Sequence, residues 1–142
     1  MLKGIHPLVN PPLLHALALM GHGDELTLAD RNFPAYAADR PVVHLDGVGV
    51  PEAARAILQL FPLDDFVDAP VLHMADPSAA GELTEVQREL VTVAEEAEGR
   101  SLRTESVPRM DFYARARRSR VVVLTGETRP YGCFVLVKGV LS

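Results

Sequence analysis

The 142-residue chain contains a single cysteine, Cys133, and no tryptophan. One cysteine excludes an internal disulfide and any metal site built from several thiolates. The chain also lacks an apolar run long enough to cross a membrane, and Met1–Pro7 shows neither the apolar core nor the cleavage site of a secretory signal. We therefore expect a cytoplasmic protein that has no membrane partner.

The chain has fewer basic than acidic residues, 14 against 19, and its formal net charge is -5. This balance gives no overall attraction to nucleic acid, and we expect none as a partner. One local basic group stands out, and a solvated or intersubunit helix face explains it better than phosphate binding does. Its members are Arg115, Arg117, Arg118 and Arg120.

Several catalytic and cofactor motifs are missing as well. Gly21-His-Gly23 follows an expected helix, whereas the glycines of phosphate loops and dinucleotide sites precede one, so we expect no cofactor. His22 and Asp24 have the spacing of two metal ligands, but no second pair accompanies them, and we expect no metal. Ser78 and Ser119 lack the surroundings of a hydrolase nucleophile.

What the chain does contain is an alternation of strand and helix patterns. Strands are expected at 25–29, 41–45, 71–74, 101–107, 121–125 and 131–137, and helices at 11–20, 51–60, 85–98 and 110–119. Thr84-Glu-Val-Gln87 has the capping-box pattern that begins a helix. The pattern predicts one α/β domain over residues 1–142, with helices on both faces of a largely parallel or mixed sheet.

The stretch Met20–Pro34 carries the densest chemistry. Gly21 and Gly23 allow the backbone to turn sharply at His22, and the strand that follows ends at Asp30. We expect His22 and Asp30 to reach one edge of the sheet by separate routes, where open α/β sheets bind ligands. Further polar candidates are Asp64, Arg109, Tyr113 and Tyr131. Each candidate also has a structural interpretation, such as a helix cap, a turn residue or a strand end.

Seven segments are distinctive when taken together, namely residues 1–8, 19–25, 30–34, 60–64 and 112–116, followed in order by Thr125-Gly-Glu127 and Tyr131-Gly132. Together they resemble the L-fucose mutarotase branch of the fucose mutarotase and ribose pyranase family. Members of that family interconvert anomers or ring forms of free sugars without a cofactor. The resemblance implies a three-layer α/β/α sandwich, an isomerase, and a homo-oligomer, with ring-shaped decamers among the expected assemblies and active sites near subunit contacts.

The resemblance also assigns roles to individual residues. His22 matches the family's proposed proton donor and Asp64 a carboxylate of the fucose branch, so both are expected to be catalytic. The expected sugar-binding residues are Asp30, Arg109, Tyr131, Gly132 and Cys133. Cys133 stands where the family commonly has Asn, and a thiol is a poor hydrogen-bonding group, so contacts of an amide side chain would be lost there.

The expected reaction is therefore mutarotation of a free monosaccharide, with L-fucose as the expected sugar. His22 would move protons, with Asp30 or Asp64 as its partner, because histidine titrates nearest neutrality. Phe33 or Phe112 would pack on a sugar face. Two alternatives remain open, namely a D-ribose pyranase-type isomerase and a non-catalytic, oligomeric sugar-binding accessory protein.

Overall fold

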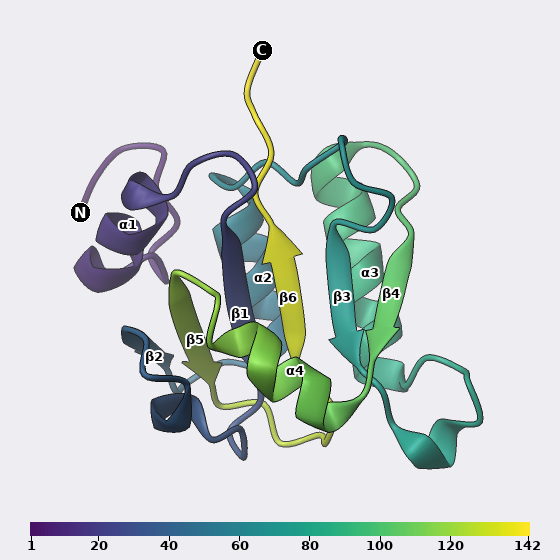
Figure 1. The fold of residues 1–142 in the computed structure, drawn as a ribbon. Helices are drawn as coiled ribbons and strands as arrows, with labels where there is room; N and C mark the ends of the chain where they lie inside the picture. Colours follow the sequence, from purple (N-terminus) through teal and green to yellow (C-terminus); the bar gives the residue numbers. More distant parts are fainter.

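The computed structural model describes residues 1–142 and places a six-stranded mixed sheet between two layers of helices (Figure 1). The strand order is β2-β5-β1-β6-β3-β4. The strands are β1 (Glu25–Ala29), β2 (Val42–Leu45), β3 (Val71–Met74), β4 (Thr104–Val107), β5 (Val121–Thr125) and β6 (Phe134–Val137). The expected three-layer α/β architecture is confirmed.

Strands β1 to β5 all run in one direction, and β6 runs against its neighbours β1 and β3. The carboxyl ends of β1 to β5 therefore meet the amino end of β6 at one edge of the sheet, which we call the carboxyl edge. The arrows of β3, β4 and β5 point to it in Figure 1. The opposite edge, where β1 begins and β6 ends, is the amino edge. This polarity decides which side chains can meet.

The helices are α1 (Pro11–Leu19), α2 (Val50–Leu58), α3 (Glu85–Glu98) and α4 (Arg109–Ala116), with short 3₁₀ turns η1 (Ala35–Ala38) and η2 (Pro77–Ala79). Helices α2 and α3 cover one face of the sheet, and α4 crosses the other face beside the carboxyl edge (Figure 1). Proline stands in the first turn of α1 and of α2, where it removes no intrahelical hydrogen bond. Thr84 and Gln87 form the predicted capping box of α3.

Two separate hydrophobic clusters fill the spaces between the layers. Leu26 and Leu28 of β1 belong to the cluster of 25 buried residues that also contains the inner faces of α1, α2 and α3. Ala29 belongs to the cluster of 12 that includes Phe112 of α4. Successive side chains of a strand point to opposite faces, so one strand supplies both cores. The sheet is thus buried on both sides, which explains its continuous apolar runs.

The sequence predicted every α-helix and strand but neither 3₁₀ turn, and the other differences lie at the ends of the elements. Only Thr104–Val107 of the expected strand at 101–107 pairs with a neighbour. The last strand begins at Phe134 and not at Tyr131, because Tyr131 has a φ of 60° and cannot continue an extended strand. None of the helices is long and apolar enough to cross a membrane.

Candidate active site

The imidazole of His22 lies at the amino edge, in the turn that connects α1 to β1. Its Nε2 is 3.0 Å from Oδ1 of Asp64. Gly23 has a φ of 83°, which glycine adopts without strain, and its N–H donates to the carbonyl oxygen of Lys138 at 2.8 Å. The glycine turn therefore fixes the histidine against the end of β6.

Asp64 reaches the same place on the segment that follows α2. Its N–H donates to the Val137 carbonyl at 3.0 Å, and Nη2 of Arg100 donates to its carbonyl oxygen at 3.1 Å. The chain passes close by at Gly139, where a Cβ atom would lie 2.7 Å from the Leu63 carbonyl oxygen. These contacts hold the Asp64 carboxylate almost entirely out of solvent, with 2% of its side chain exposed.

His22 and Asp64, which we call the dyad, differ in their access to solvent. The His22 side chain is 39% exposed, while its carboxylate partner is buried. The rings of Phe66 and His22 are nearly perpendicular, with their centres 4.7 Å apart, and the Phe66 N–H lies 3.3 Å from Oδ1 of Asp64. A buried carboxylate can orient the ring and leave the imidazole free to exchange protons with a bound molecule.

At the carboxyl edge, Asp30 organises a second group of predicted site residues. Its Oδ2 accepts hydrogen bonds from the Gly132 N–H at 3.2 Å and from Sγ of Cys133 at 3.4 Å, and its Oδ1 accepts one from the Asn32 N–H at 3.0 Å. The side chain is buried. An ionised carboxylate offers about four acceptor positions, and three of those of Asp30 hold the adjoining loops in place.

Tyr131 and Arg109 complete the predicted set at this edge. Tyr131 lies in the loop between β5 and β6, directly before Gly132. Arg109 is the first residue of α4 and follows the carboxyl end of β4, with its guanidinium carbon 5.9 Å from the centre of the Tyr113 ring. This distance allows a cation–π contact. The five predicted sugar-binding residues therefore come from the carboxyl edge.

The expectation that His22 and Asp30 share one edge of the sheet is wrong within a single chain. His22 precedes β1 and Asp30 follows it, and five residues of strand span about 15 Å. Of the two carboxylates considered as partners of the histidine, Asp64 is the neighbour. The expectation that Phe33 or Phe112 packs on a sugar is also wrong for this chain, because both rings are buried and pack on each other at 5.8 Å.

Two buried groups behind the carboxyl edge have shifted pKa values. Burial, and after it the charge of Asp30, raises the pKa of the Cys133 thiol well above its ordinary value, so the thiol stays neutral. The hydrogen bond from Arg129 lowers the pKa of Glu127 to about 2. Glu127 also accepts from the Val50 N–H at the start of α2, at 3.2 Å. In the sequence, only the Gly126-Glu127 pair indicated that Glu127 belongs near the site. No sequence pattern predicted its hydrogen bond to the start of α2.

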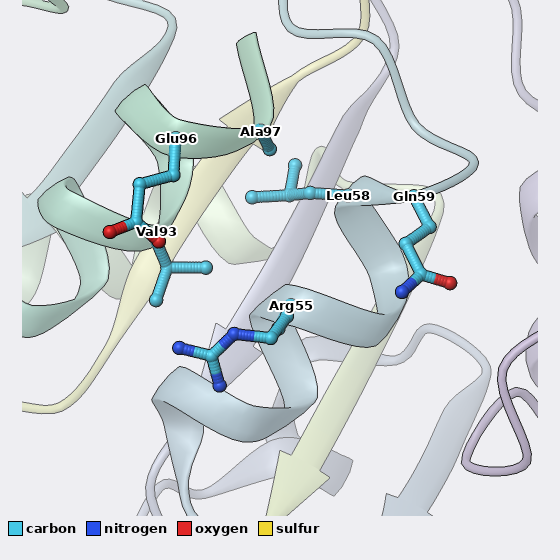
Figure 2. Close-up of a pocket in the computed structure, with 6 residues that line it drawn as sticks. All are labelled: Arg55, Leu58, Gln59, Val93, Glu96 and Ala97. Atoms are coloured by element: carbon cyan, nitrogen blue, oxygen red, sulfur yellow. The ribbon is translucent and has the colours of Figure 1, made fainter. Parts of the chain in front are cut away.

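The structure also shows a hollow whose lining contains none of the predicted site residues. Figure 2 shows it between α2 and α3, the two helices that cover one face of the sheet. The lining residues are Arg55, Leu58, Gln59, Val93, Glu96 and Ala97. No group of three or more His, Cys, Asp or Glu side chains is arranged to hold a metal ion.

The sequence of the chain matches that of a known protein family. Residues 3–141 match the model of the RbsD / FucU transport protein family. An L-fucose mutarotase of Haemophilus influenzae (strain 86-028NP) is 41% identical over 140 residues, which cover 99% of this chain and 97% of the relative.

Two solved structures are similar over the whole chain. FucU from Bifidobacterium longum has a TM-score of 0.91 and 36% identity, and the match covers 99% of this chain and 100% of that one. The fucose mutarotase from Streptococcus pneumoniae, solved in complex with L-fucose, has a TM-score of 0.88 and 34% identity with the same coverage.

Proposed function

Because the chain belongs to the RbsD / FucU transport protein family, we propose that it is a carbohydrate isomerase that interconverts the α and β anomers of L-fucose. The similarity to L-fucose mutarotases along the whole chain supports this reaction and this sugar. The observation that carries the proposal is the dyad, a solvent-accessible imidazole 3.0 Å from a buried carboxylate. Such a pair moves protons without a cofactor.

Mutarotation needs two proton transfers and no net chemical change. A base removes the proton of the anomeric hydroxyl, an acid protonates the ring oxygen, the bond between C1 and the ring oxygen breaks, and the aldehyde forms. Ring closure on the other face reverses these steps. His22 accepts and returns the proton, and Asp64 stabilises the imidazolium form between the two transfers. General acid/base catalysis of this kind contributes about 10²- to 10⁴-fold.

The sugar-binding half of the site is proposed to be the carboxyl edge. A free sugar carries hydroxyls and no charge, so directional hydrogen bonds dominate its recognition. Asp30 keeps an acceptor position, Arg109 supplies exposed donors, and the backbone of 131–133 supplies further polar groups. The thiol of Cys133 points to Asp30, so any contact of this residue with the sugar comes from its backbone.

We propose that two copies of the chain assemble each site, since the dyad and Asp30 lie at opposite edges of the sheet. The amino edge of one copy would face the carboxyl edge of the next, and such a head-to-tail contact repeats until a ring closes. Exposed apolar side chains near the dyad, Phe66 and Val67, suit a covered surface. The proposed assembly is a ring-shaped homo-oligomer, for which the family resemblance suggests a decamer. The cytoplasm is its proposed location, which a single unpaired cysteine suits.

Saturation-transfer NMR on α- and β-L-fucose tests the reaction directly. We expect the wild-type protein to accelerate exchange, His22→Ala to lose most of the acceleration while remaining folded, and His15→Ala to keep it. His15 is a matched control because it is an exposed histidine on α1. Unchanged exchange in a folded His22→Ala protein would refute the role of the dyad.

The same measurement separates the alternatives. D-Ribose, D-galactose and D-glucose complete the sugar panel. Faster exchange for D-ribose than for L-fucose would identify a pyranase-type isomerase. Binding of L-fucose without accelerated exchange of any sugar would identify a non-catalytic sugar-binding protein.

A further inference from the structure

We infer that Gln87 is a positioning residue of the sugar-binding half-site, because its side-chain amide holds the peptide group between Tyr131 and Gly132 in place. The inference rests on the proposed function, which supplies L-fucose as the substrate. It gives α3 a role in sugar affinity, although the helix begins outside the predicted site. The observations are a set of hydrogen bonds, a strained residue and a peptide group held from both sides.

The Gln87 side chain is buried, with 1% of the residue exposed, and all three of its hydrogen bonds are within the protein. Its Nε2 donates to the Met74 carbonyl at 2.8 Å and to the Tyr131 carbonyl at 3.1 Å. Its Oε1 accepts from the Thr84 N–H at 3.0 Å. One amide therefore connects the start of α3, the end of β3 and the loop before β6.

Tyr131 needs such a partner because its φ of 60° lies in the left-handed region. A bulky residue rarely adopts this conformation, and it persists only where the surroundings hold it. The Tyr131 carbonyl and the Gly132 N–H belong to one planar peptide group. Gln87 binds the carbonyl side, and Asp30 accepts from the N–H side at 3.2 Å. Rotation of this peptide would break both contacts.

A second contact ties the same loop to α3. Arg129 pairs with Glu89 of α3, at 2.6 Å between Nη1 and Oε2, as an ion pair without the alignment of a hydrogen bond. Glu127 lies beneath Gly132, where a Cβ atom would be 3.2 Å from Cγ of Glu127. Arg129 and Glu127 thus hold the first part of the loop, and Gln87 holds the carbonyl side of the Tyr131–Gly132 peptide.

The capping box alone does not explain the choice of an amide at position 87. Glutamate and glutamine both serve as the third residue of a capping box, since the box needs only an acceptor for the Thr84 N–H. A glutamate would place a carboxylate against the carbonyls of Met74 and Tyr131. The two donors of the amide are therefore the property that the loop requires.

Gln87→Glu separates the two roles, because it keeps the capping acceptor and removes both donors. We expect KM for L-fucose to rise about tenfold at pH 8, since a buried carbonyl loses its partner, while kcat changes less because the dyad lies at the other edge. Lowering the pH protonates the new carboxyl group and restores one O–H donor, so KM should return toward the wild-type value.

Thr84→Ala is the matched control. It removes the hydroxyl that accepts from the Gln87 N–H and leaves the side-chain amide in place, so it should lower the melting temperature without changing KM. A wild-type KM in Gln87→Glu, or an equal rise in Thr84→Ala, would overturn the inference.

Hydrogen exchange of the Gly132 amide, followed by NMR, tests the role of Gln87 without measuring catalysis. We expect strong protection in the wild-type and Thr84→Ala proteins and faster exchange in Gln87→Glu. If the wild-type protein does not accelerate fucose exchange, the proposed function fails and this amide still decides the role of Gln87. Equal protection of Gly132 in all three proteins would refute that role.

Discussion

His22 and Asp64 form a hydrogen-bonded pair at 3.0 Å although 42 positions separate them in the chain. The pair is asymmetric, because backbone contacts hold the carboxylate inside the protein while the imidazole keeps a face toward solvent. The buried carboxylate orients the imidazole and leaves the ring accessible to a bound sugar.

Asp64→Asn should lower kcat for L-fucose anomer exchange by about 10- to 100-fold and leave KM nearly unchanged. Asparagine keeps the size of the side chain but loses the charge, and a hydrogen bond to a charged group is worth about 1.5–3 kcal/mol. NMR exchange rates at several fucose concentrations give both constants. Asp65→Asn is the control, since Asp65 is the exposed carboxylate next in the chain. An unchanged kcat would remove Asp64 from the mechanism.

Inactive variants from opposite edges should complement each other if two copies build each site. His22→Ala alters the amino edge and Arg109→Ala the carboxyl edge, so some contacts in a mixed oligomer join an intact dyad to an intact sugar-binding edge. Random mixing gives about a quarter of such contacts. We expect co-expression of the two variants to recover about that share of the wild-type exchange rate.

The control for complementation is a pair of variants from the same edge. Co-expressed His22→Ala and Asp64→Asn should recover little, because intact dyads form only within one chain. Activity no higher than that of the separate variants in the first mixture would contradict a site shared between copies.

Glu127 should stabilise the fold above pH 4.5 and lose this effect as the pH falls. Its pKa is lowered from 4.5 to about 2, chiefly by Arg129, so the folded state favours the ionised form. A depressed carboxyl pKa contributes stability above the unfolded value, and protonation removes it between pH 4.5 and about 2.

Urea unfolding of Glu127→Gln at several pH values checks this contribution. The difference in unfolding free energy from wild type should be largest at pH 7 and shrink below pH 4. Glu52→Gln is the control, because Glu52 is an exposed carboxylate in the first turn of α2. A difference that does not depend on pH would show that the Glu127 charge does not stabilise the fold.

Cys133 should resist alkylation in the folded protein. Burial and the neighbouring Asp30 raise the pKa of its thiol, and only the thiolate is an effective nucleophile. We expect no reaction with iodoacetamide at pH 8 and complete reaction in 8 M urea, measured by mass spectrometry. Cys133→Ser serves as the unlabelled control. Rapid labelling without urea would mean that the loop opens and exposes the thiol.

Local patterns predicted the secondary structure well because each depends on a few neighbouring residues. The β-branched run of β5 favours an extended strand, and Thr84 with Gln87 marks the start of α3 within one turn. The start of β6 was predicted less well. The left-handed conformation of Tyr131 is maintained by contacts with distant elements, which no local pattern reveals.

The sequence by itself determined the alternation of elements, the two-sided burial of the sheet and the set of candidate residues, because periodicity and residue chemistry are local properties. Only the tertiary structure decided which candidates meet. The segment after α2 pairs with the end of β6 and so brings Asp64 beside His22, whereas Asp30 lies at the far edge because it and His22 flank the same strand, β1. Strand order and side-chain partners depend on pairing between segments that are distant in the chain. A hydrophobic pattern shows which face of an element is buried, but it does not show which other element packs against that face.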